Sequence, residues 1–140
     1  MIDFVYNTDF HIKNHEALSR WLVDVAAAEN CMIHDLVFSF VSDQELLDMN
    51  KKYLKHNYFT DVITFGELDG DKISGNIAIS VDRVIDNSKT YAVSFDDELK
   101  RVMAHGLLHI VGYNDNTEKE KLIMSQKETD ALKMFHVKQV

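Results

Sequence analysis

Short strand-like runs and longer helix-like runs are mixed along this chain, and this mixture is the feature that most limits its possible folds. Residues 2–6, 36–41, 61–65 and 76–81 are rich in β-branched and aromatic residues, which favours strands. Residues 66–75 hold glycine and aspartate, which are typical of turns, and therefore predict a hairpin. Because strands and helices do not alternate strictly, we expect an α+β fold in which a small mixed β-sheet packs against several helices.

The predicted helices are marked by residues that can cap a helix N-terminus. Ser42 and Thr117 are each followed three residues later by a glutamate, which is the pattern of a capping box. The run after Asn14 places its apolar residues at the i, i+3, i+4, i+7 spacing of an amphipathic helix. The five predicted helix starts are Asn14, Ser42, Asp82, Ser94 and Thr117.

The composition is that of one globular domain over residues 1–140. Hydrophobic residues make up 46% of the chain and charged residues 27%, which excludes a wholly disordered chain. No apolar run approaches the roughly 20 residues of a membrane helix, and Asp3 in a start without basic residues argues against a signal peptide. Cys31 is the single cysteine and cannot form an intrachain disulfide. We therefore expect a cytoplasmic protein that has no membrane partner.

The net charge of -8, from 15 Lys+Arg against 23 Asp+Glu, limits how this chain can meet nucleic acid. A protein that coats nucleic acid through bulk positive charge is excluded. A local basic groove, or a metal ion that meets phosphate, is not excluded.

The clearest chemical signal is the segment from His105 to Asp115, which has the spacing H-x3-H-x2-G-x2-D. On a helix, His105 and His109 are offset by only about 40° and point the same way, as two ligands of one metal ion do. Gly112 can end the helix in a left-handed conformation, and the returning chain can bring Asp115 to the same ion. The segment predicts a metal site on a helix and the turn after it.

Two other interpretations of this segment stay open. A histidine pair at i, i+4 is often only polar filling on an amphipathic helix, and Asp115 also suits an ordinary polar turn. The spacing is also that of the metzincin proteases, H-E-x-x-H-x-x-G-x-x-H, which would make the chain a metal-dependent hydrolase of another substrate. Gly106, in place of the catalytic glutamate, speaks against a peptidase.

Taken with its neighbours, the segment resembles the YbeY endoribonucleases, a family of zinc-dependent factors of ribosomal RNA maturation. The family signature H-G-x-L-H-L-x-G-Y-D-H matches residues 105–115. The family runs L-N-x-x-Y-R, T-D-V-L-S-F and G-D-I-x-I-S match residues 49–54, 60–65 and 75–80 in the same order. The resemblance covers about residues 45–130, which is most of the chain.

This resemblance implies one Zn²⁺ per chain, held by His105, His109 and Asp115. The third family ligand is histidine, and Asp115 replaces it here; two histidines with a carboxylate are also a known catalytic zinc set. Leu54 stands where the family has an arginine suited to holding RNA phosphate.

The function implied is a single-strand-directed endoribonuclease that acts in ribosomal RNA maturation, at the 3′ end of the small-subunit rRNA, and in ribosome quality control. Its partners would be ribosomal RNA or ribosomal particles. The main alternative is a ribosome-assembly factor with a structural metal and a binding role.

The remaining site residues are less sharply indicated. Candidates for the general acid or base are Asp61, Glu98 and Asp115, although Asp61 is also suited to capping a turn. Basic residues gather beside Tyr53 and Tyr58, where they suit an RNA path with stacked bases or, equally, a solvated helix end. These basic residues are Lys51, Lys52 and Lys55.

Overall fold

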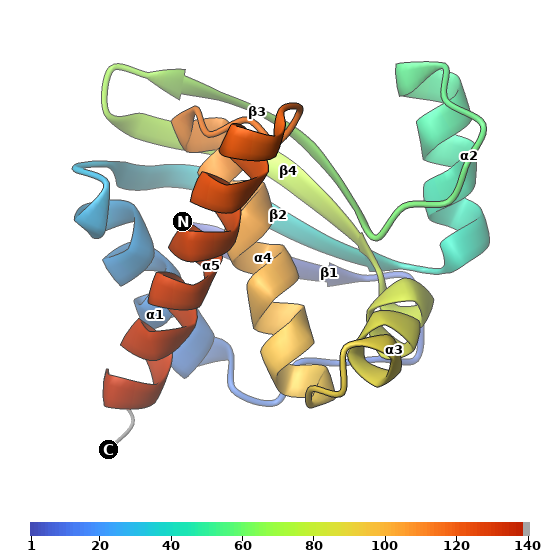
Figure 1. Ribbon diagram of the computed structural model, residues 1–140, viewed down its shortest axis with the longest axis horizontal. Coiled ribbons are helices and arrows are strands. Elements are labelled where there is room, and N and C mark those ends of the chain that lie inside the picture. Colours follow the sequence, from blue (N-terminus) through green and yellow to red (C-terminus); the bar gives the residue numbers. More distant parts are fainter. Residues whose placement is uncertain (139–140) are drawn as a thin grey trace.

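One four-stranded mixed sheet forms the base of the fold in the computed structural model, which describes residues 1–138, with side chains to residue 135 (Figure 1). The order in the sheet is β1-β2-β4-β3. β1 and β2 are parallel, as are β2 and β4, whereas β3 and β4 form an antiparallel hairpin. The strands are β1 (Ile2–Tyr6), β2 (Met32–Val41), β3 (Val62–Asp69) and β4 (Lys72–Ser80). The predicted α+β class is confirmed.

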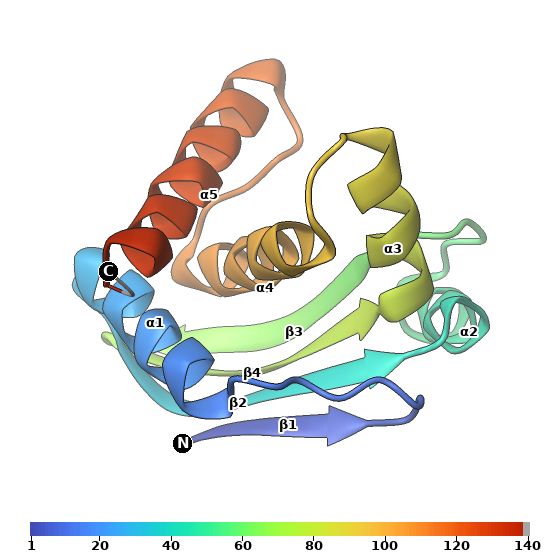
Figure 2. The ribbon, with the colours of Figure 1, turned by 90° about the horizontal axis from the view of Figure 1, so that it is seen from below.

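Helices cover one face of this sheet and close its end. Figure 2 shows α1, α4 and α5 above one face, with α4 next to the sheet, and α2 at the end where β2 finishes. The helices are α1 (His15–Ala28), α2 (Asp43–Leu54), α3 (Val81–Thr90), α4 (Phe95–Val111) and α5 (Glu118–Lys138). The core lies between the sheet and the helices, and its largest buried side chains include Phe38, Phe40, Leu22 and Leu107.

Most predicted helix starts are confirmed by hydrogen bonds at the caps. Ser42 Oγ and Ser94 Oγ each accept the backbone N–H three residues later, at 3.1 Å. The capping box at Thr117 is complete, because the Thr117 N–H also donates to Glu120 Oε1 at 2.9 Å. Asn14 precedes α1, but its side chain makes no capping bond.

One predicted start differs by one residue, because α3 begins at Val81 and not at Asp82. Ser80, and not Asp82, caps α3, because Ser80 Oγ accepts the backbone N–H of Arg83 at 3.1 Å. The Asp82 carboxylate accepts the backbone N–H of Asp43 at 2.9 Å instead, and so joins α3 to the start of α2.

The hairpin predicted over residues 66–75 is confirmed, but its turn is shorter than the glycine- and aspartate-rich segment, because β3 and β4 continue through most of it. Gly66 and Gly75 are paired across β3 and β4, and the turn itself is at Gly70, whose φ is +63°. A Cβ on Gly66 would lie 2.7 Å from Ile110 Cδ1, and one on Gly75 would lie 2.9 Å from the same atom. The glycines therefore let α4 approach the hairpin closely, which no local turn signal expresses.

Gly106 brings the same helix against β4. A Cβ at Gly106 would lie 2.8 Å from Ile77 Cγ2, so α4 rests directly on the sheet at this turn. This close packing fixes where the flanking residues His105 and His109 lie relative to β3.

Within residues 1–138, no helix is both long and apolar enough to cross a membrane.

Candidate metal centre

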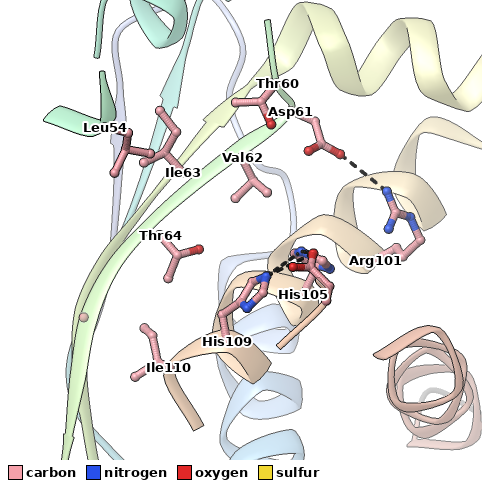
Figure 3. A pocket seen from close by; sticks show the side chains of 12 residues that line it. Leu54, Thr60, Asp61, Val62, Ile63, Thr64, Arg101, His105, His109 and Ile110 are labelled. Atoms are coloured by element: carbon pink, nitrogen blue, oxygen red, sulfur yellow. Dashed lines mark hydrogen bonds and ion pairs between the residues drawn. The ribbon is translucent and has the colours of Figure 1, made fainter. Parts of the chain in front are cut away.

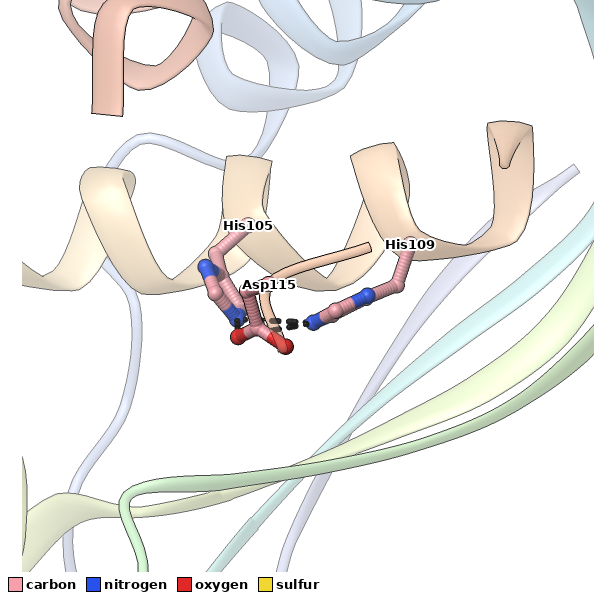
Figure 4. Close-up of side chains that lie close together, drawn as sticks. All are labelled: His105, His109 and Asp115. Carbon is pink, nitrogen blue, oxygen red and sulfur yellow. Dashed lines mark hydrogen bonds and ion pairs between the residues drawn. The ribbon is translucent and has the colours of Figure 1, made fainter. Parts of the chain in front are cut away.

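Three side chains converge after the middle of α4, as the sequence spacing predicts (Figure 4). The Nε2 atoms of His105 and His109 are 2.9 Å apart. Asp115 Oδ2 lies 3.3 Å from Nε2 of His105 and 3.4 Å from Nε2 of His109. Among the described residues, these form a group of three that could hold a metal ion.

The other ring nitrogen of each histidine, Nδ1, lies within hydrogen-bond distance of an acceptor oxygen. His105 Nδ1 lies 2.6 Å from Glu128 Oε2, and His109 Nδ1 lies 2.8 Å from the carbonyl oxygen of Tyr113. An ionised carboxylate and a carbonyl only accept, so both Nδ1 atoms carry the proton. In the neutral rings, both Nε2 atoms then present lone pairs toward Asp115.

This donor set fits a metal ion. Two lone pairs and a carboxylate oxygen within 3.4 Å repel one another unless a cation lies between them. Ligands at about 2.0–2.2 Å from a tetrahedral Zn²⁺ are separated by about 3.3–3.5 Å, which matches the distances from Asp115 to the two histidines. Three protein ligands leave one position open, which is the arrangement of catalytic rather than structural zinc sites.

The turn after α4 carries Asp115 back to the histidines. Gly112 has a φ of +126°, and its N–H donates to the carbonyl oxygens of Leu108 and His109, both at 3.1 Å. The next residue, Tyr113, donates its hydroxyl to Glu29 Oε1 at 2.5 Å and so ties the turn to the end of α1. This hydrogen bond raises the pKa of Tyr113, and burial adds to the increase.

The metal ligands line a pocket of about 500 Å³ between α4 and β3 (Figure 3). Asp61 and Thr64 face it from the side of β3, and Leu54 closes it from the end of α2. On the opposite side are Arg101, His105, His109, Ile110 and Asp115.

Arg101 is a residue of this pocket that sequence reasoning missed. Its Nε and Nη2 donate to the two oxygens of Glu98, at 3.0 and 2.5 Å, and its Nη1 donates to Glu128 Oε1 at 3.2 Å. The hydrogen bonds to Glu98, with the charge of Glu128, raise the pKa of Arg101. Arg101 precedes His105 by four residues, a spacing that marks one helix face and was available in the sequence.

Glu128 was also missed as a site residue. It is 6% exposed, and its two oxygens join the metal ligand His105 to Arg101. It lies on α5, 23 residues from His105, so only the packing of α5 on α4 brings them together. No local spacing signals this contact.

The candidate acids and bases fall in different places. Asp61 lines the pocket, and its Oδ2 lies 3.5 Å from both Arg101 Nη2 and Asn87 Nδ2. Glu98 is 2% exposed, does not line the pocket, and is bound to Arg101 by both oxygens. Asp61 and Asp115 are therefore positioned to meet a molecule in the pocket, whereas Glu98 lies behind Arg101.

The three candidate lysines lie outside the pocket, on and just after the last turn of α2. They flank Leu54, which does line it, and all are exposed: Lys51, Lys52 and Lys55. Tyr53 and Tyr58 beside them are 56% and 57% exposed. The pocket thus opens beside an exposed surface of basic and aromatic side chains.

Comparison with known proteins adds independent findings. The family described as Endoribonuclease YbeY matches residues 4–136. Endoribonuclease YbeY of Flavobacterium psychrophilum is 43% identical over 139 residues, which is 99% of each chain. Endoribonuclease YbeY of Karelsulcia muelleri is 46% identical over 128 residues, 91% of each chain.

A solved structure has a similar fold. The solution structure of TM1509 from Thermotoga maritima has a TM-score of 0.72 and 25% sequence identity, and the match covers 99% of this chain and 91% of that one. The motifs, the fold and the near-complete match to these relatives agree, and the chain belongs to the endoribonuclease YbeY family.

Proposed function

We propose that this chain is a zinc-dependent endoribonuclease that cleaves single-stranded RNA. The reaction takes place at the Zn²⁺ ion that His105, His109 and Asp115 hold. The observation that carries the proposal is the convergence of these three ligands at the edge of an open pocket, beside an exposed basic and aromatic surface. The names of the relatives, all endoribonucleases, support RNA as the substrate. We take residues 1–140 as one catalytic domain.

Zinc suits the donor set better than a harder cation. Two imidazole nitrogens and one carboxylate oxygen are ligands that Zn²⁺ prefers, whereas Mg²⁺ and Ca²⁺ select oxygen. When bound, Zn²⁺ polarises a phosphate oxygen and lowers the pKa of a coordinated water.

The chain's own groups supply the proton transfer. Asp61 faces the pocket from the residue just before β3, and its side chain is 23% exposed, so it can meet solvent and substrate. We assign the proton transfer to an oxygen of Asp61. Glu98 has no path to the pocket, and we assign it the task of orienting Arg101.

The surface beside the pocket suits an unpaired strand. Exposed aromatic rings stack on bases that are not held in a duplex, and lysines follow the backbone phosphates. Tyr53 and Tyr58 are exposed, and Lys52 Nζ lies 5.2 Å from the centre of the Tyr53 ring. We infer that RNA enters over these residues with Lys51 and Lys55 beside it, and reaches the metal centre past Leu54.

The biological substrate that we propose is ribosomal RNA. We infer that the enzyme acts at the 3′ end of the small-subunit rRNA precursor and in ribosome quality control, on free RNA or on ribosomal particles in the cytoplasm. These inferences rest on the family resemblance.

The test is cleavage of a small-subunit rRNA 3′ precursor by purified protein, with added zinc and with a chelator. We expect cleavage at unpaired positions, lost with the chelator and restored by zinc. His105→Ala, measured for metal content and for RNA binding as well as for cleavage, should lose metal and cleavage while its RNA binding remains measurable.

The assembly-factor alternative predicts a different result. The zinc-loaded wild type would then bind the precursor without cleaving it, and the chelator would change stability but not RNA products. A peptidase would leave RNA intact and cut peptides.

A further inference from the structure

Arg101 is the one lysine or arginine among the residues that line the pocket. The position on the wall at the end of α2 is occupied by the apolar Leu54. An RNA phosphate that enters this pocket therefore meets the positively charged guanidinium of Arg101 next to the metal ligands.

The guanidinium keeps hydrogen-bond donors for a ligand. Arginine has five N–H donors, and three of these are used within 3.2 Å by Glu98 and Glu128. The two that remain, one on each terminal nitrogen, have only Asp61 at 3.5 Å, which is the limit of a hydrogen bond. Figure 3 shows the guanidinium facing Asp61 along the pocket that also holds His105 and His109.

Two buried carboxylates hold the guanidinium in this orientation. Glu98 binds it with both oxygens, and Glu128 binds it while also holding His105. The positions of the guanidinium and of one metal ligand are therefore set by the same side chain. A planar fork fixed in this way matches two oxygens of a phosphate, which the point charge of a lysine does not.

Arg101 offsets part of the negative charge around the pocket. Asp61 and Asp115 line the pocket, and Glu98 and Glu128 lie directly behind it. Two histidines that bind a metal ion as neutral ligands contribute no charge. A divalent ion would then be the one positive group facing four carboxylates if Arg101 were absent. Arg101 lowers this excess of negative charge and places a positive charge where an anionic substrate would enter.

We propose that Arg101 binds the RNA phosphate next to the metal centre and is a substrate-binding residue of this enzyme. This inference rests on the proposed function, and it adds a specific phosphate contact to it.

The test compares two variants that differ only in the guanidinium. Removal of Arg101 alone would leave Glu98 charged and buried, so Glu98→Gln serves as the reference and Glu98→Gln/Arg101→Met as the test protein. Arg20→Met is the matched control, because Arg20 is an exposed arginine on α1 whose side chain is 69% exposed.

Two readouts are taken on zinc-loaded protein: affinity for inorganic phosphate, by calorimetry, and the KM and kcat for a short single-stranded RNA. A charge-assisted hydrogen bond lost to methionine should weaken phosphate affinity and raise KM by about 10- to 100-fold relative to Glu98→Gln. Zinc stoichiometry should stay the same in both, and Arg20→Met should behave as wild type.

A purely structural role for Arg101 predicts lower thermal stability with unchanged phosphate affinity and KM, and that result overturns the proposal. So does a zinc-loaded wild-type protein that binds no phosphate. If no RNA is cut by the wild type, the proposed function fails, but the phosphate comparison still decides the role of Arg101.

Arg101→Lys gives a second measure if the double variant does not fold. Lysine keeps the charge but loses the fork, so we expect a smaller loss of phosphate affinity, of about threefold to tenfold. Unchanged phosphate affinity in Arg101→Lys would overturn the proposal.

Discussion

Glu128 offers a sharp test of how α5 supports the metal centre. Its two oxygens accept from His105 Nδ1 at 2.6 Å and from Arg101 Nη1 at 3.2 Å. Glutamine at this position has one oxygen and one NH₂ group, so it can accept from only one of the two donors. The shorter contact indicates that the oxygen stays on His105, which sets the new NH₂ group against Arg101.

The size of the effect follows from these two contacts. His105 keeps a hydrogen bond but loses the carboxylate charge that makes its Nε2 a stronger ligand, so zinc affinity should fall about 10- to 100-fold. A donor that faces a donor at a 6% exposed position should also destabilise the metal-free protein by about 1–3 kcal/mol. Arg101 is 28% exposed and can turn toward water, so the lower end of that range is expected.

The assay is competition for zinc with a chromophoric chelator, together with urea unfolding of the metal-free proteins. Asp130→Asn is the matched control, because Asp130 is an exposed carboxylate on the same helix that accepts from Gln126 and does not contact the metal ligands. Zinc affinity of Glu128→Gln within twofold of Asp130→Asn would refute the positioning role of Glu128.

Three further predictions follow from other parts of the structure. Asp115→Ala should lose much of the zinc affinity whereas Asp115→His keeps it, as metal titration will show; equal affinities in both and in the wild type would remove Asp115 from the site. The three exposed lysines beside the pocket are Lys51, Lys52 and Lys55. Replacing all three with alanine should weaken RNA binding and flatten its salt dependence, and an unchanged slope of affinity against salt concentration would contradict the proposed RNA path. Hydrogen bonds to Glu29 raise the pKa values of Tyr113 and Lys127, so the stabilisation from this cluster is present below the unfolded-state values of about 10 and is lost as the pH rises through the raised values. Urea unfolding between pH 8 and 11 should show this loss in the wild type and a flatter profile in Glu29→Gln.

The parts of the fold set by local chemistry were predictable from the sequence. The strand at residues 2–6 and the helix that starts after Ser94 are found where their patterns place them. The metal ligands were predictable for the same reason, since an i, i+4 spacing and a glycine stop at Gly112 are properties of one short segment.

Features that depend on tertiary packing were not predictable. Gly66 and Gly75 were interpreted as turn residues because glycine is common in turns, but close contacts with Ile110 and with the backbone of the facing strand leave no room for a Cβ. Glu128 could not be linked to His105 without knowing how α5 packs on α4. The position of Arg101 could have been predicted, because Glu98, Arg101 and His105 share a helix face. Its role could not, because it depends on the pocket wall that β3 supplies.

The most direct test of the whole account is single-turnover cleavage of a short single-stranded RNA by protein with measured zinc content. We expect cleavage to rise in proportion to the zinc bound, up to one ion per chain, and His105→Ala neither to bind that ion nor to cleave. Full cleavage by metal-free protein, or by His105→Ala, would contradict it.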